Sequence, residues 1–315
     1  RKWFLPHFEK MLYDQALLAR TCLEAGQATG NRLFLNTAQE IFTYVLRDMT
    51  SADGAFYAAE DADSEGVEGK FYVWTVEAFR EALEDKALAR RWETILGLET
   101  DGNFTEEATG EKTGANIPFL TAPLAEWAKR LGSPESELET EWETVRERLL
   151  AVRSRRIRPL RDEKILTDWN GLMIAALAAG SRVLNRAEYG RAARSAADHI
   201  LAVMRDGNGR LLHRFRDGES GIAAMADDYA FLISALLELY RTFFEPVFLQ
   251  EALSLQRQMI DEFWDGENGA FFLSAKTSSD LPVRPKELYD GALPSANSVS
   301  LGNLVFLSRL TGNPQ

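Results

Sequence analysis

Apolar residues recur at steps of three and four along most of the chain, which is the spacing of a buried helix face. In the first such segment Leu12, Ala16, Ala19 and Leu23 follow these steps. Ile41, Tyr44 and Val45 continue the pattern after a break near residues 26–31. The same spacing predicts helices over residues 76–96, 135–152, 168–184, 188–204, 225–240 and 246–263. Since Gly, Asn and Pro separate these segments, the sequence predicts a succession of helical hairpins.

Three segments repeat one local pattern, an Asp-Gly turn followed by a short apolar strand, and each follows a predicted helix. They occupy residues 53–57, 206–213 and 265–272. The later two lead to Asp228 and Asp290, each of which opens another helical segment, and Asp14 and Asp168 head similar segments. A period of about 60 residues made of two helices and a hairpin-like loop predicts a closed ring of helix pairs. The inner helices would then bring their acidic N-terminal turns to one mouth, although each Asp is equally explained as a helix N-cap.

Composition and charge exclude several classes of protein. The 48 acidic and 36 basic side chains give a formal net charge of −12, which argues against binding to a nucleic-acid backbone. No apolar run approaches the ~20 residues that a membrane span requires, so we expect no contact with a membrane. Cys22 is the single cysteine, which excludes an internal disulfide and fits a reducing compartment. A cytoplasmic location is therefore predicted.

Five strings of the sequence are long and unusual enough to indicate a family. They are PHFEKMLYDQ at residues 6–15, AEDADSEG at 59–66, GKFYVW at 69–74, LTDWNG at 166–171 and RPKELYDG at 284–291. Together they resemble the thioredoxin-domain-containing proteins of the YyaL and spermatogenesis-associated protein 20 type. Two positions depart from the family pattern: Asp162 and Glu163 precede Lys164, and Ala296 stands where the family often has Gly.

The resemblance implies an all-α fold, an (α/α)6 toroid similar to six-hairpin glycosidases and N-acylglucosamine 2-epimerases, with short β-hairpins in the connecting loops. It implies one barrel domain over residues 1–315, truncated at both ends. The family's thioredoxin-like domain, a partner of the toroid, would precede residue 1, and further hairpins would follow residue 315. The resemblance supplies a fold and a site, but no established reaction.

Carboxylates crowd one loop, at Glu60, Asp61, Asp63, Glu65 and Glu68, with Asp53 just upstream. Crowding raises the pKa of one carboxyl above that of its neighbour, and glycoside cleavage requires such an acid and base pair. A solvated acidic loop is the competing interpretation. Histidine is a further acid or base near neutral pH, although His7 is also explained as a hydrogen-bonded structural residue. The predicted catalytic residues are His7, Asp61, Asp63, Asp168 and Asp228.

Aromatic residues stand beside several of these acids, an arrangement that suits a sugar, because rings stack on its apolar face while polar groups bind its hydroxyls. Core packing explains many of the same rings. Arg284 and Lys286 precede the Asp290 segment and would bind an anionic sugar. The predicted substrate-binding residues are Tyr13, Asp14, Glu60, Trp74, Trp169, Asn170, Tyr229, Arg284, Lys286 and Asp290.

The chain offers few metal ligands. Its three histidines are His7, His199 and His213, and we interpret His199 as structural and leave the role of His213 open. Without thiolates this set predicts no transition-metal site and no cofactor. Calcium is an alternative, because residues 61–66 imitate the start of an EF-hand loop, yet the twelfth position is Tyr72 rather than a bidentate Glu.

These observations predict a carbohydrate-active toroid that binds a small carbohydrate and hydrolyses or epimerises it. Hydrolysis is favoured, since isomerases of this shape rely on histidine pairs and this chain has few histidines. The alternative is a non-catalytic module that binds a glycan or a protein for the thioredoxin-like domain. A third interpretation makes the acids helix caps around a vestigial cavity. A shared fold does not decide among the three.

Overall fold

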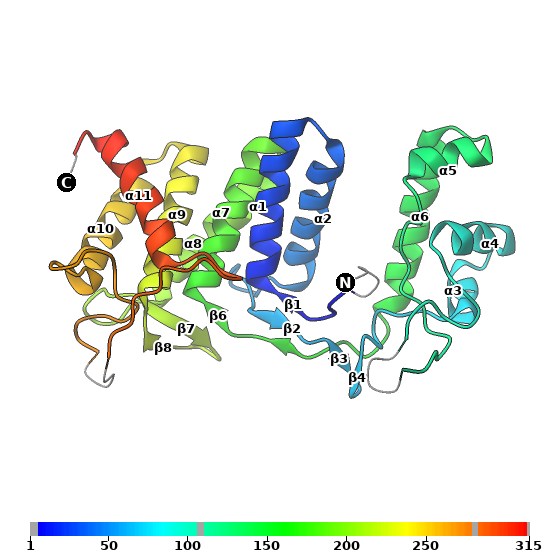
Figure 1. Cartoon of the computed structure of the whole chain (residues 1–315), viewed down its shortest axis with the longest axis horizontal. Helices are drawn as coiled ribbons and strands as arrows, with labels where there is room; N and C mark the ends of the chain where they lie inside the picture. The colour runs from blue at the N-terminus through cyan, green and yellow to red at the C-terminus, as the bar shows by residue number, and fades with distance from the viewer. Residues whose placement is uncertain (1–5, 106–109, 279–282, 314–315) are drawn as a thin grey trace. The chain divides into compact units, whose positions relative to one another are not determined.

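The structure is a computed structural model that describes residues 6–105, 110–278 and 283–313 (Figure 1). The chain divides into two compact units. Unit 1 comprises residues up to 9 and residues 61–160, and unit 2 comprises residues 10–60 and 161 onward. Unit 1 is thus inserted into unit 2 along the chain. The single barrel domain over residues 1–315 stays a prediction.

Unit 2 is built of helix pairs. Its helices are α1 (Leu12–Thr29), α2 (Arg32–Asp48), α7 (Thr167–Val183), α8 (Ala187–Val203), α9 (Ala226–Phe243), α10 (Pro246–Phe263) and α11 (Ala296–Thr311). Helices α1, α7, α9 and α11 pack side by side in that order, and α2, α8 and α10 each pack on one of the first three (Figure 1). This is the arrangement of inner and outer helices that the hairpin pattern predicts.

The inner helices are buried because their residues are apolar or small on nearly every face. In α7, 11 of 17 residues are buried, and in α9, 12 of 18. Gly171 marks the closest approach of these two helices: a Cβ added there would lie 2.7 Å from the carbonyl carbon of Phe231. By contrast α8 buries one face, at Tyr189, Ala193, Ala197 and neighbouring residues. The difference identifies α7 and α9 as inner and α8 as outer.

Short antiparallel strands lie at the N-terminal ends of the inner helices. One sheet has the order β1 (Lys10–Met11), β2 (Ala59–Glu60) and β5 (Arg161–Asp162). A second has the order β6 (Ile165–Leu166), β7 (Leu212–Arg216) and β8 (Glu219–Ala223). Glu60 pairs with Lys10 on one side and with Arg161 on the other, so both ends of the insertion meet in the first sheet. The expected β-hairpins in the connecting loops are therefore present.

The three repeated turns form the same structure. After α2, α8 and α10 the chain makes the antiparallel bridges Thr50–Phe56, Arg205–Leu211 and Trp264–Phe271. After each turn, a polar side chain from the inner helix that follows binds the backbone of the bridged segment. We call each of these contacts a clasp. Asn170 accepts from the backbone N–H of Phe56 at 2.8 Å and donates to its carbonyl at 2.9 Å, and Asn297 binds Phe271 in the same way, at 2.7 and 2.9 Å. The Tyr229 hydroxyl accepts from the Leu211 N–H at 3.2 Å.

Removal of the first clasp tests this account. The Asn170→Ala variant leaves the buried N–H and carbonyl of Phe56 without partners, and unsatisfied buried groups cost about 1–3 kcal/mol each. We expect the free energy of unfolding to fall by about 2–4 kcal/mol in urea denaturation. The matched control is Asn208→Ala, in an exposed turn, where we expect a change within about 0.5 kcal/mol. Equal stability of the two variants would contradict the clasp.

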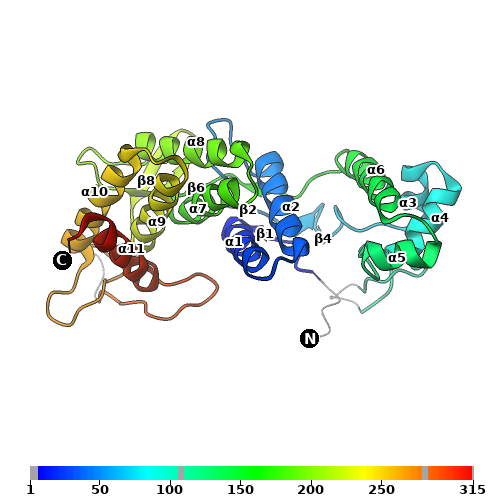
Figure 2. The same cartoon turned by 90° about the horizontal axis from the view of Figure 1, so that it is seen from above.

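Unit 1 has its own hydrophobic core. Its helices α3, α4, α5 and α6 are grouped together in Figure 2. Its elements are β3 (Asp63–Ser64), β4 (Val67–Glu68), α3 (Val76–Leu83), α4 (Lys86–Ile95), α5 (Leu124–Leu131) and α6 (Glu135–Arg153). The single helix predicted over 76–96 is wrong, because Glu84 has a positive φ of 61° and Asp85 caps a new helix. The Asp85 carboxylate accepts from the N–H groups of Ala87 and Leu88, at 2.8 and 3.0 Å. Among the described helices of both units, none combines the length and the hydropathy that crossing a bilayer requires.

Candidate functional site

Three ionisable side chains meet at the N-terminal ends of α7 and α9. Ligand atoms of Asp168, His213 and Asp228 all lie within 4.8 Å of one another. His213 comes from β7, and its Nδ1 lies 2.9 and 3.1 Å from the two carboxylate oxygens of Asp228. Asp168 and Asp228 are buried, whereas the His213 side chain is 19% exposed. The cluster therefore joins two carboxyl groups and an imidazole that solvent still reaches.

Backbone N–H groups fix the Asp228 carboxylate. One oxygen accepts from the N–H of Asp168 at 3.1 Å, and the other accepts from the N–H of Met225 at 2.8 Å. Asp228 thus caps its own helix and also the neighbouring α7, and the positive ends of both helix dipoles favour its negative charge. Asp168 accepts from the N–H of Trp169 at 2.8 Å. Asp168 and Asp228 therefore fit both interpretations: each binds an N–H group at a helix start, and each belongs to the candidate site.

Burial and neighbouring charge give these groups unusual proton affinities. Burial, and then the Asp228 carboxylate, raise the pKa of Asp168 to about 7. The hydrogen bond to Asp228 is the largest cause that raises the pKa of His213 above its ordinary value. At neutral pH a substantial fraction of Asp168 therefore carries a proton, which ordinary carboxyls do not.

Asp227, adjacent to Asp228, is a further perturbed acid that the sequence analysis did not select. Its half-buried carboxylate interacts with the backbone N–H of Ala296, at the start of α11. Burial, and then the charge of Asp228, raise the pKa of Asp227 to about 6. Asp227 and Asp228 therefore bind the N-terminal turns of α11 and α7, one on each side of α9. Two consecutive aspartates at the start of a predicted helix, Asp227 and Asp228, are the sequence signal that could have identified Asp227.

Two predicted aromatic residues lie beside the cluster. Trp169, in the first turn of α7, packs against Tyr13 of α1, with ring centroids 4.9 Å apart and planes at 69°. Both side chains are partly exposed. This pair offers partly exposed ring surface in the first turns of α1 and α7, which suits the apolar face of a sugar. Asp14 is exposed in the same turn of α1, and Glu60 is buried in β2.

Other residues predicted to bind substrate make structural hydrogen bonds. Asn170 and Tyr229 form the clasps described above. Arg284 donates to the carbonyl of Ser274, at 2.6 Å from Nη2, and to that of Glu262. Lys286 donates to Asp265 and to the Gly269 carbonyl, at 2.5 and 2.7 Å.

Asp290 is exposed, and its carboxylate accepts from the N–H of Ser295 at 2.9 Å, which lowers its pKa. This contact holds the segment that leads into α11.

The predicted residues of the acidic loop belong to unit 1. His7, Asp61 and Asp63 are exposed there, and the Asp61 carboxylate accepts from the N–H of Asp63 at 3.2 Å. Trp74 lies in the core of unit 1, with the guanidinium of Arg156 4.1 Å from its ring centroid. Calcium binding by this loop stays a prediction.

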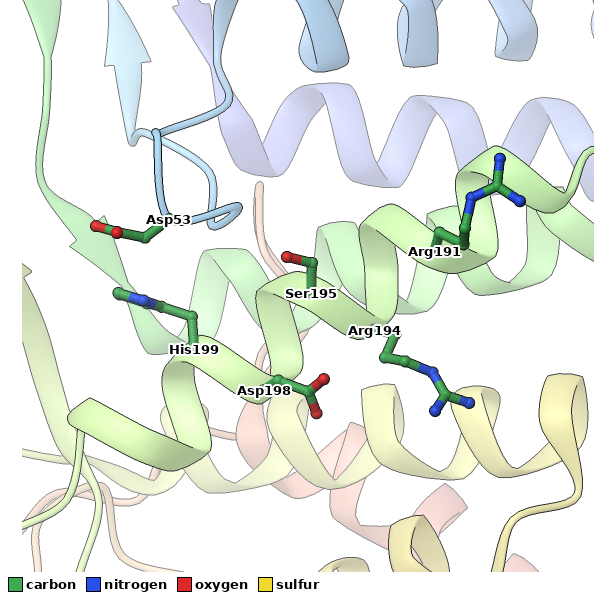
Figure 3. Close-up of a pocket in the computed structure, with 6 residues that line it drawn as sticks. All are labelled: Asp53, Arg191, Arg194, Ser195, Asp198 and His199. Carbon is green, nitrogen blue, oxygen red and sulfur yellow. The ribbon is translucent and has the colours of Figure 1, made fainter.

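A separate hollow of about 420 Å³ lies along α8 (Figure 3). His199, Ser195 and Asp198 line it from the helix, and Asp53 faces His199 from the turn after α2. The ring of His199 packs edge-on against Phe215, at 5.0 Å between centroids, and burial lowers its pKa. These contacts agree with the structural role expected for His199.

The donor set of Asp168, His213 and Asp228 also suits a divalent cation, and it is the one such group among the described residues. Both Asp228 oxygens, however, already accept backbone N–H groups. The Asp228 carboxylate is therefore already engaged by two backbone N–H groups and by the His213 ring.

The inner and outer helices and their connecting hairpins have the arrangement of an (α/α)6 toroid. Among solved structures, unsaturated glucuronyl hydrolase from Bacillus sp. GL1 is similar, with a TM-score of 0.51 at 14% identity over 96% of this chain and 58% of that one. The predicted all-α toroid fold is confirmed.

No family model matches the chain. The chain is 35% identical over 99% of its length to human spermatogenesis-associated protein 20, and 36% identical to the rat protein. The predicted resemblance to this family is therefore confirmed for the portion represented here. The chain spans 43% of the length of these relatives.

Proposed function

We propose that the cluster at the N-terminal ends of α7 and α9 hydrolyses a glycosidic bond by acid–base catalysis. The observation that carries this proposal is a buried carboxyl, Asp168, whose pKa is raised to about 7 beside a second acid, Asp227, whose pKa is about 6. Two carboxyl groups whose proton affinities differ can serve as acid and base in one site.

Each group has a defined part in the reaction. Protonated Asp168 donates its proton to the glycosidic oxygen as the bond from the anomeric carbon to that oxygen breaks. Ionised Asp227 accepts a proton from a water molecule, whose oxygen bonds to the anomeric carbon. Asp228, held by two backbone N–H groups, positions His213. A proton then passes from Asp227 to solvent and from solvent to Asp168.

Charge indicates which sugars suit this site. The charges that act on Asp168 and Asp227 within unit 2 are the other aspartates, Glu287 and His213. Arg284 and Lys286, which the sequence analysis assigned to an anionic sugar, are engaged elsewhere. A neutral or amino sugar therefore suits the site better than a uronate, the class of substrate named for the similar hydrolase.

A panel of 4-nitrophenyl glycosides of neutral, amino and acidic sugars tests the proposal, with release of nitrophenol as the readout. We expect turnover of a neutral or amino glycoside. Reducing disaccharides, followed by NMR, test epimerisation in parallel. Epimerisation without hydrolysis, or turnover that survives Asp168→Asn, would contradict the assignment.

The two pKa values predict a narrow pH dependence. Asp227 must lose its proton to act as base, so kcat/KM should rise with pH through about 6. Asp168 must keep its proton to act as acid, so kcat/KM should fall as pH rises through about 7. We expect a bell-shaped profile between these values, and a rising limb that is lost in Asp227→Asn. A profile flat from pH 5 to 9 would contradict both roles.

The second candidate is a binding module that presents a glycan or a protein to a thioredoxin-like domain. The observation that favours it is that the relatives are more than twice as long as this chain. Saturable binding of a sugar with no turnover, unchanged by Asp168→Asn, would favour this function over hydrolysis.

A further inference from the structure

Positive charge is concentrated near the C-terminal ends of α7 and α9. Arg20 of α1, Arg182 of α7 and Arg241 of α9 all contact one buried carboxylate, Glu238. Arg20 Nη2 and Arg241 Nη1 lie 3.3 and 2.8 Å from Glu238 Oε1, and Arg182 Nη2 binds Oε2. Three inner helices thus supply three guanidinium groups to a single negative charge.

The charge at this cluster is not balanced. Among the described residues one other carboxylate joins it, the exposed Glu24, 2.6 Å from Arg20 Nε. Three positive charges therefore face two negative ones, in a protein whose formal net charge is −12. The arginine side chains remain 34%, 29% and 49% exposed at Arg20, Arg182 and Arg241, whereas Glu238 is 8% exposed.

Hydrogen-bond donors are also left over. Arg182 uses Nη1 on the Glu238 carbonyl and the Thr242 hydroxyl, as well as Nη2 on the Glu238 carboxylate. Arg241 has five N–H donors and makes a single hydrogen bond among the described residues, to Glu238. The unused donors of Arg241 are therefore available to a ligand.

These groups border a cavity of about 330 Å³, which we call the arginine pocket. Arg20, Arg182, Arg241, Glu24 and Gln27 line it with polar groups, and Leu23 and Val183 add apolar surface. A phosphate or carboxylate group fits this space, and guanidinium forks match the oxygens of such groups two at a time.

The arginine pocket is separate from the acidic cluster. Asp168 lies in the first turn of α7 and Arg182 in the last, and Asp228 and Arg241 have the same relation in α9. Fourteen residues of helix place the two ends roughly 20 Å apart. Binding at one end therefore need not displace a ligand at the other.

We propose that the arginine pocket binds a small multivalent oxyanion, either a phosphate or a polycarboxylate. The ligand would bridge Arg241 and Arg20 and accept hydrogen bonds from the donors that Glu238 leaves unused. Gln27 would donate a further hydrogen bond from its side-chain amide.

Isothermal titration of the chain with inorganic phosphate and with citrate, at constant ionic strength in sodium chloride, tests the proposal. We expect saturable binding of at least one of these anions with a stoichiometry near one, and the two titrations distinguish phosphate from carboxylate as the preferred group. Absence of saturable binding for both anions would overturn the proposal.

Two exposed substitutions should change the affinity in opposite directions. Arg241→Gln removes unused donors and should weaken binding about 10-fold, since a hydrogen bond to a charged group contributes about 1.5 kcal/mol. Glu24→Gln removes a competing carboxylate and should strengthen binding. Arg216→Gln, at the exposed tip of the β7–β8 hairpin, changes net charge equally and is the control. An equal loss in Arg216→Gln and Arg241→Gln would show non-specific attraction and overturn the proposal.

Discussion

Replacement of Asp168 by Asn is expected to lower kcat at least about 100-fold on any glycoside that the chain hydrolyses, with a smaller change in KM. An amide cannot donate a proton to the leaving oxygen, but it keeps the shape of the carboxyl and its bond to the Trp169 N–H. The substitution therefore removes the proposed proton donor while the local fold is preserved. Steady-state kinetics on the substrate identified in the glycoside panel measure the effect.

Asp217→Asn is the control for this experiment. Asp217 is exposed at the tip of the β7–β8 hairpin, and its φ of 53° is a conformation that Asn tolerates well. We expect its kcat within a factor of two of the unmodified chain. If Asp168→Asn and the control gave equal rates, Asp168 would have no part in the reaction.

Gly171→Ala is expected to destabilise unit 2 by about 3 kcal/mol. The added methyl would lie 2.7 to 2.9 Å from the backbone of Phe231 and Leu232, which side-chain rotation cannot relieve. Helices α7 and α9 must then separate, and the buried surface between them loses contact. Urea denaturation, followed by circular dichroism, measures the change.

Gly302→Ala makes the same chemical change, but we expect it to raise the stability of the chain. Gly302 lies on the exposed face of α11, and no atom lies within 4 Å of an added methyl. Ala is a better helix former than Gly by about 1 kcal/mol, so this variant should be more stable than the unmodified chain. A destabilised Gly302→Ala would show that something other than close helix packing governs these positions.

The sequence predicted the repeat and, through it, part of the candidate site. The spacing of Asp168 and Asp228 placed both at starts of inner helices, and the structure brings them to one end of neighbouring helices. His213 was left open, since a single histidine in a strand carries no pattern of its own. Only the pairing of β7 with β6 brings it to Asp228.

The acidic loop shows why density of charge alone predicts a site poorly. Asp61 and Asp63 remain exposed to solvent, although the acidic loop is one of the densest runs of carboxylates in the chain. Asp168 and Asp227 have fewer carboxylates near them in the sequence but lose water on folding. Burial depends on which helices pack together, and the local sequence does not determine that packing.

The clasps were predicted as binding residues for a related reason. Asn170 and Tyr229 stand beside acids in the sequence and carry groups that suit a sugar. The repeat offered a way to recognise the role of Asn170, since Asn297 holds the equivalent position in the helix that follows the third turn. Comparing equivalent positions in the repeats therefore identifies structural residues better than noting which residues stand beside an acid in the sequence.

The antiparallel pairing of Glu60 with Arg161 has a consequence for how this fold changes over evolutionary time. Residues 61–160, the main part of unit 1, leave and rejoin unit 2 through adjacent strands, as the two ends of a hairpin loop do. Since loop closure costs only about 0.6 kcal/mol for each doubling of length, a short turn and an insertion of this size differ by roughly 3 kcal/mol. Natural selection can therefore lengthen, exchange or delete unit 1 without disturbing the helix pairs that carry Asp168 and Asp228. The proton-transfer groups and the inserted unit are free to diversify at different rates.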